Sequence, residues 1–169
     1  MSRDTWGKTP LSLALRKSPE TVIAVLGTNA NVVDSDGNTP LHAAVAERAG
    51  PEVLRALIQA KFPVNNRNRT GSTALLLAVR NGDEAATRAL RAAGADPFAA
   101  DNSGASALTL ALTTSLPLLN ALVDTAADRT DTVGDGILHY AARLADEKTV
   151  ARLLTLPNVD RAARNVSGE

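Results

Sequence analysis

The sequence predicts an all-α protein built as a solenoid of stacked helix–turn–helix units. One motif of turn-forming, apolar and small residues returns along the whole chain, and its fullest copy is DGNTPLHAA at residues 36–44. Aligned on one glycine of each copy, successive copies are 30, 34, 33, 30 and 34 residues apart. A period of this size is typical of proteins in which each unit packs only on its neighbours. The aligned glycines are Gly7, Gly37, Gly71, Gly104, Gly134 and Gly168.

Each copy predicts two short helices. In the first copy, Thr9 is placed to cap a helix and Pro10 has no amide hydrogen to lose in the first turn. A second helix opens at Pro19, the place that Pro51 and Pro117 take in later copies, and apolar residues recur behind it at helical spacing. Aligned on these prolines, Leu118 stands where Glu20 and Glu52 stand in the other copies. We therefore expect Leu118 to be exposed.

The repeated residues resemble the ankyrin repeat, whose signature is Thr-Pro-Leu-His-x-Ala in a period of 33. Residues 39–44 carry this signature in full, and the third copy carries the family's later residues at 81–82 (NG) and 93–96 (AGAD). The fifth copy departs from it, with Gly136 and Ile137 in place of Thr-Pro. The resemblance implies an ankyrin-repeat solenoid of helix–turn–helix units joined by β-hairpin fingers.

We expect one domain over residues 1–169. The predicted repeats cover residues 4–33, 34–67, 68–100, 101–130 and 131–165, and residues 166–169 begin a further copy. Because a stack that stops there would leave the last repeat less covered, we expect the native protein to continue with at least one more repeat. The turns should open on short acceptor side chains, at Asp4, Asp34, Asp101 and Asp131.

The composition excludes several classes of partner and chemistry. There are 18 basic and 18 acidic residues, so net charge gives no reason to expect a nucleic acid or a membrane surface as partner. The chain has no cysteine, which excludes disulfides. No apolar run approaches the ~20 residues of a membrane span, and residues 1–4 have no signal-peptide core. We expect a soluble, monomeric chain without a membrane span. The sequence does not identify its compartment, although it favours a cytoplasmic chain.

The sequence offers little for catalysis or metal binding. His42 and His139 fall at the same position of their repeats, where the resemblance implies a structural hydrogen bond, and the other copies carry Ser12, Leu76 and Thr109 there. A zinc site would need three or four converging ligands, and the histidines are about 97 residues apart. No Gly-x-Ser-x-Gly or phosphate-binding loop occurs. We expect no enzyme activity, no metal and no cofactor.

The resemblance implies that partners are held at the finger tips and on the concave side of the inner helices. We therefore expect a non-enzymatic scaffold for protein–protein interaction. The candidate partner-binding residues are Trp6, Lys8, Arg16, Lys17, Asp36, Asn38, Glu47, Arg48, Arg67, Arg69, Arg80, Asn81, Thr113 and Arg143.

Basic residues predominate among these candidates in the first three repeats. An acidic segment of a protein partner would fit that half, although a solvated face with a chance excess of arginine explains it as well. Two alternatives remain: an anionic partner or nucleic acid bound by the basic half, or a targeting arm of a longer enzyme. Trp6 either anchors a partner or covers the end of the first repeat.

Overall fold

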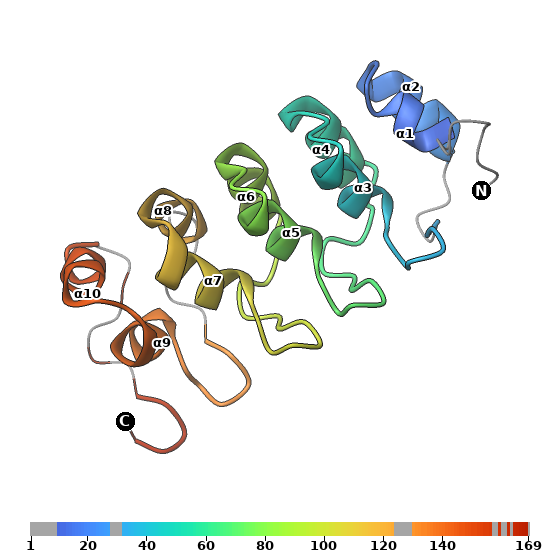
Figure 1. Cartoon of the computed structure of the whole chain (residues 1–169). Helices are drawn as coiled ribbons and strands as arrows, with labels where there is room; N and C mark the ends of the chain where they lie inside the picture. The colour runs from blue at the N-terminus through green and yellow to red at the C-terminus, as the bar shows by residue number, and fades with distance from the viewer. Residues whose placement is uncertain are drawn as a thin grey trace.

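The computed structural model describes residues 10–27, 32–123, 130–156, 159, 162 and 164–168. In these residues ten α-helices run in pairs, and the pairs stack side by side into an elongated array (Figure 1). The predicted helical solenoid is confirmed. The pairs are α1 (Pro10–Ala14) with α2 (Pro19–Leu26), α3 (Pro40–Ala46) with α4 (Pro51–Gln59), α5 (Ala74–Arg80) with α6 (Glu84–Ala92), α7 (Ala107–Thr114) with α8 (Leu116–Val123), and α9 (Ile137–Leu144) with α10 (Glu147–Leu154).

The apolar core runs along the stack instead of filling one centre. The closest helix contacts lie within a pair and between neighbouring pairs, as where α5 packs on α3, α6 and α7. The same leucine of successive inner helices is buried in the first four layers, at Leu11, Leu41, Leu75 and Leu108, and its equivalent in the fifth, Leu138, is partly buried. Each pair therefore depends on its neighbours to bury its apolar side, as in other repeat proteins.

Short polar side chains fix where the helices begin. Ser18 caps α2 by accepting a hydrogen bond from the Thr21 amide, and Thr73 caps α5 in the same way. Asp83 and Asp146 cap α6 and α10. These acceptors satisfy amides that have no partner within the helix. The predicted cap Thr9 lies outside the described residues.

The expectation that Leu118 is exposed is wrong, because its side chain is 5% exposed. Helix α8 begins at Leu116, so Pro117 is its second residue and takes the place of Glu52 instead of Pro51. Leu118 then corresponds to Val53, which is 3% exposed. The prolines of the two helices are not equivalent, and an alignment on them shifts α8 by one residue.

The finger turns between the pairs share one hydrogen-bond pattern. In the first described turn the Asp34 carboxylate accepts from the amides of Asp36 and Asn38, at 2.8 Å each. Asn68, Asp101 and Asp131 accept from the amides two and four residues later in the same way. The predicted turn-opening aspartates are confirmed at Asp34, Asp101 and Asp131, while Asp4 lies outside the described residues.

The fingers have hairpin turns with very little strand pairing. In the described segments, the pairing is limited to one isolated antiparallel bridge between Thr130 and Gly136. Neighbouring fingers also lie close together. Gly71 has φ of 78°, and a Cβ atom there would lie 2.8 Å from the Asn102 amide nitrogen. Glycine is therefore required by both the left-handed turn and the adjacent finger.

Candidate functional site

One side of the stack combines the C-terminal ends of the inner helices with the finger turns. The odd-numbered helices lie on the side from which the turns project (Figure 1). We call this side the inner face. Its exposed positions differ from pair to pair, whereas the buried leucines beneath them recur. Exposed inner-face residues include Arg16, Lys17, Asp36, Glu47, Arg48, Arg69, Arg80, Thr113, Thr114, Arg143 and Leu144.

The first two pairs are joined across the inner face by an ion pair. The Arg16 guanidinium lies 3.0 Å from the Glu47 carboxylate, and the two side chains are 63% and 32% exposed. An exposed pair of this kind contributes little to stability. Both side chains remain accessible to a partner.

Arg48 ties the second pair to the third. Its guanidinium donates to the Asn81 carbonyl at 3.0 Å, and the Asn81 amide group donates back to the Val45 carbonyl at 3.3 Å. Glu47 and Asn81 occupy the same position after α3 and α5, so Arg48 corresponds to Gly82. Both Arg48 and Gly82 have positive φ.

Arg67 braces two successive fingers. Its Nε donates to the Gly71 carbonyl at 2.9 Å, and its Nη2 donates to the Ala100 carbonyl at 2.7 Å. A guanidinium has five N–H donors in a planar fork and can hold two carbonyls at once. The side chain thus has a structural role in addition to its place on the surface.

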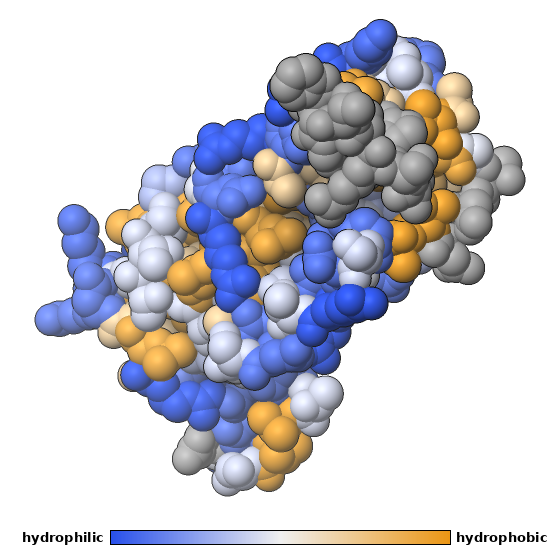
Figure 2. Space-filling model, turned by 45° about the vertical axis from the view of Figure 1, so that its right-hand side comes forward, coloured by the Kyte–Doolittle hydropathy of each residue, from blue (hydrophilic) through white to orange (hydrophobic). Residues whose placement is uncertain are grey.

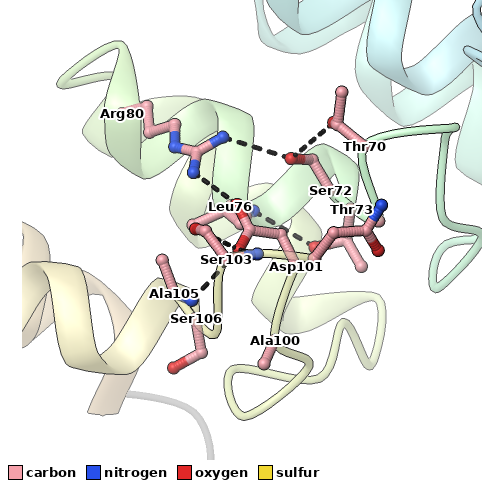
Figure 3. A network of polar contacts seen from close by, with 12 residues as sticks. Thr70, Ser72, Thr73, Leu76, Arg80, Ala100, Asp101, Ser103, Ala105 and Ser106 are labelled. Atoms are coloured by element: carbon pink, nitrogen blue, oxygen red, sulfur yellow. Dashed lines mark hydrogen bonds and ion pairs between the residues drawn. The ribbon is translucent and has the colours of Figure 1, made fainter.

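Arg80 belongs to a polar network between the third and fourth pairs (Figure 3). Its Nη2 lies 2.5 Å from the Asp101 carboxylate, and its Nη1 donates to the Ser72 hydroxyl at 3.1 Å. The Asp101 side chain is 5% exposed, whereas that of Arg80 is 39% exposed. The Ser103 hydroxyl, Arg80 and two backbone amides hold the pKa of Asp101 well below its usual range, against the effect of burial. The carboxylate is therefore ionised at neutral pH.

A second arginine–aspartate pair lies in the fifth helix pair. Arg143 forms an ion pair with the buried Asp135, whose carboxylate also accepts from the Asn165 side chain at 2.7 Å. Arg143 and then Asn165 lower the pKa of Asp135. The Arg143 guanidinium carbon lies 5.2 Å from the centre of the Tyr140 ring, within cation–π range. Burial, and then the hydrogen bond that Tyr140 donates to Asp131, raise the pKa of Tyr140 to about 12.

His42 has the structural role expected for it. The residue is 1% exposed, and its Nδ1 accepts from the Thr39 amide at 3.2 Å. Its Nε2 therefore carries the hydrogen and donates to the Ser72 carbonyl of the next pair at 2.8 Å. Burial lowers the pKa of His42. His139 accepts from the Gly136 amide through Nδ1 at 3.1 Å, in the same local arrangement.

The fourth pair gives the inner face an uncharged stretch. Thr113 and Thr114 are the last two residues of α7 and correspond to Arg80, the last residue of α5, and Asn81, its C-cap. Their hydroxyls donate to the Leu110 carbonyl, at 3.1 Å and 2.6 Å. With the hydroxyl hydrogens used on the backbone, this stretch offers mainly apolar contact.

The remaining candidates are divided between the finger tips and undescribed residues. Asp36 and Arg69 are exposed at successive tips, which are joined by a hydrogen bond from the Arg69 amide to the Asp36 carbonyl at 2.9 Å. Asn38 is half-buried and accepts from the Asn68 side chain at 2.8 Å. Trp6 and Lys8 lie outside the described residues.

Sequence reasoning missed the internal partners of the inner-face arginines. The sequence predicts Asp101 only as a turn residue, although its second carboxylate oxygen accepts a hydrogen bond from Arg80. The separation of 21 residues between them does not match the repeat period, so the period gives no signal for the pair. Asp135 lies eight residues before Arg143 within one repeat, a local spacing that could have suggested that second pair.

Two kinds of site are absent from the described part of the chain. No group of three or more His, Asp or Glu residues there is placed to hold a metal ion. None of the described helices is long and apolar enough to cross a bilayer.

The family profile described as "Ankyrin repeats (3 copies)" matches residues 1–68 and 45–133, which together cover most of the chain. The chain belongs to the ankyrin-repeat family. Ankyrin repeats are generally protein–protein interaction modules.

Individual relatives agree with this assignment. The chain is 44% identical over 94 residues to human neurogenic locus notch homolog protein 4, covering 53% of this chain and 5% of that protein. It is 34% identical over 124 residues to a putative ankyrin repeat-containing protein of Treponema pallidum, covering 72% of this chain and 42% of that protein. The crystal structure of the ankyrin repeat domain of Bcl-3 matches with a TM-score of 0.66 and 28% identity, covering 96% of this chain and 75% of that one. The chain thus spans less than half the length of both curated relatives.

Proposed function

We propose that this ankyrin-repeat chain binds a partner protein on its inner face, through the inner-helix ends and the finger tips. The observation that carries the proposal is the contrast between a repeated buried frame and variable exposed residues above it. Leu41, Leu75 and Leu108 recur beneath the face, while Arg80 gives way to Thr113 on it. Exposed residues that vary above a constant buried frame are what a surface matched to a particular partner would show.

The rigidity of the stack supports this proposal. Side chains such as Arg48, Arg67 and Arg80 are already held by hydrogen bonds to neighbouring layers. A partner that docks on ordered groups has less conformational entropy to remove, so more of the contact energy appears as affinity.

The face in Figure 2 alternates between hydrophobic and hydrophilic areas, a mixture common in protein interfaces that are not permanent.

The charges suggest where an acidic segment of the partner would lie. Lys17 and Arg69 are exposed, and no residue that the structure describes pairs with their side chains. Together they favour an acidic stretch across the first three pairs. The uncharged stretch at Thr113 and Thr114 would accept apolar parts of the same partner.

The alternative of an anionic ligand or nucleic acid has weaker support. Phosphate binding needs several guanidinium or ammonium groups directed outward. Arg16, Arg48, Arg67 and Arg80 instead each donate to an acceptor within the chain. That the chain is a targeting arm of a longer enzyme stays a prediction, which the full gene product would test.

The test is affinity capture with cross-linking, followed by binding measurements on purified variants. The chain is used as bait, and each captured protein is purified and its Kd measured. The double variant Lys17→Glu with Arg69→Glu reverses two inner-face charges. Lys148→Glu and Gln59→Glu, at exposed positions of the outer helices α10 and α4, serve as matched controls.

We expect the double variant to raise Kd by at least about tenfold, because two new carboxylates would face an acidic segment and like charges brought together at an interface cost several kcal/mol. The controls should bind as the wild type does. Cross-links that fall on α4, α6 or α10, together with loss of binding by the control variants, would place the interface on the outer helices and overturn the proposal.

A further inference from the structure

Among the finger turns that the structure describes, neighbours are joined by backbone hydrogen bonds at three of the four junctions. In each case an amide of one turn donates to a carbonyl of the turn before it, at 2.9 to 3.1 Å. The turns at residues 101–105 and 131–135 are described completely, yet no backbone hydrogen bond joins them. The bonds elsewhere run from Arg69 to Asp36, from Asn102 to Thr70 and from Val166 to Val133.

A side-chain bridge is missing at the same junction. At two other described junctions the first residue of a turn donates its side-chain amide to the residue that follows the glycine in the preceding turn, from Asn68 to Asn38 at 2.8 Å and from Asn165 to Asp135 at 2.7 Å. Between the third and fourth pairs Asp101 has no amide to donate, and Arg80 instead links Ser72 to Asp101. The equivalent residues between the fourth and fifth pairs are Asp131 and Ala105. The alanine side chain has no hydrogen-bond acceptor. The Asp131 carboxylate instead accepts a hydrogen bond from the Tyr140 hydroxyl, within its own repeat, at 2.7 Å.

The histidine bridge is also absent there, as it is at the preceding junction, where Leu76 holds the histidine position. Thr109 occupies the position of His42, and its hydroxyl oxygen accepts from the Ser106 amide at 2.9 Å, as His42 Nδ1 does from Thr39. The same hydroxyl donates back to the Ser106 carbonyl at 3.1 Å. Thr109 thus reproduces the local half of the histidine arrangement and lacks the second nitrogen that reaches the next layer.

The outer helices separate at this point as well. Helices α2, α4, α6 and α8 pack closely in succession, whereas α10 makes few contacts with α8. The fifth pair is attached by α9, which packs on α7, and by the Phe98 and Tyr140 rings, whose centres are 5.7 Å apart. The first of these attachments joins two inner helices.

From these observations we infer that the junction between the fourth and fifth helix pairs is a built-in joint. The fifth pair, α9 with α10, opens as a separate unit while the second to fourth pairs stay folded. In a linear stack, stability is the sum of unit terms and interface terms, so the unit behind the weakest interface opens first. Because the fifth pair carries Arg143 and Leu144 to the inner face, the joint also lets that end of the face change its angle.

Native-state hydrogen exchange tests the inference on the whole chain. In the wild type we expect residues 137–154 to exchange through a local opening of the fifth pair. That open state should be at least about tenfold more populated than the open state that exposes residues 74–92. Thr109→His restores the ring nitrogen that can reach the Asp135 carbonyl. One added buried hydrogen bond should lower the opening of residues 137–154 by about twofold to tenfold.

Thr109→Leu is the matched control, because Leu76 shows that leucine fits the same position in the third pair. Leucine cannot bridge, so this variant should leave exchange of residues 137–154 unchanged. Equal slowing by histidine and leucine would show that packing alone acts, and would overturn the inference. So would a wild type in which residues 74–92 and 137–154 exchange through one common opening, a result that needs no variant to fold.

Discussion

At the scale of single residues, the inner-face arginines hold the stack together as well as facing outward. Arg80 and Arg143 each place a partly exposed guanidinium on a nearly buried aspartate. The repeat pattern predicted the surface position of both side chains. It did not predict their partners, because Asp101 and Asp135 occupy different positions relative to the repeat glycine.

This role gives a prediction for Arg80→Ala. The change leaves the Asp101 carboxylate without its ion-pair partner, and a buried charge that loses its partner is destabilising. We expect the melting temperature to fall by at least about 2–4 °C, the shift that a modest loss of stability gives in a chain of this length. Differential scanning calorimetry measures it.

The control is Arg55→Ala. Arg55 pairs with Glu52 on the outer helix α4, where the two side chains are 58% and 70% exposed. Such a pair contributes little, so this variant should melt close to the wild type. If both variants melted at the wild-type temperature, the network around Asp101 would make no measurable contribution to stability.

At the scale of elements, the sequence predicted helix pairs well and helix boundaries less well. The spacing of apolar residues was enough to predict α3 to α6. The proline pattern predicts the start of α8 one residue late, because Leu116 precedes Pro117 in the helix. Proline is accepted at more than one place in a first turn, so the capping residue decides the boundary.

The bridge between pairs two and three gives a prediction on pH. Burial lowers the pKa of His42, so the folded chain holds the neutral form while the unfolded chain takes up a proton near its ordinary pKa of about 6.5. The unfolded state then binds more protons, and stability falls as the pH drops below about 6.5. Urea unfolding at pH 7.5 and 5.5 should show this loss in the wild type.

His42→Leu removes the titrating group and places there the residue that the third pair already has. We expect this variant to be less stable at pH 7.5, because the Ser72 carbonyl loses its donor. Its stability should also change less between pH 7.5 and 5.5 than that of the wild type. An equal change of stability with pH in both proteins would mean that protonation of His42 does not cause the loss of stability at low pH.

At the scale of the whole molecule, the regular period predicted a stack without a common centre, and the structure confirms it. The period could not predict how strongly each junction is tied. That depends on single substitutions within a constant frame, such as Thr109 for histidine and Ala105 for a side chain with an acceptor. The repeated residues determine the fold, and these substitutions determine which junction opens first.

Small-angle X-ray scattering tests the central claim most directly, because a partner-binding inner face requires helix pairs placed side by side in an extended row. We predict an asymmetric pair-distance distribution with a long tail, and a radius of gyration above the about 15 Å expected for a compact chain of 169 residues. A symmetric distribution with a radius of gyration near that compact value would contradict the stack and the inner face with it.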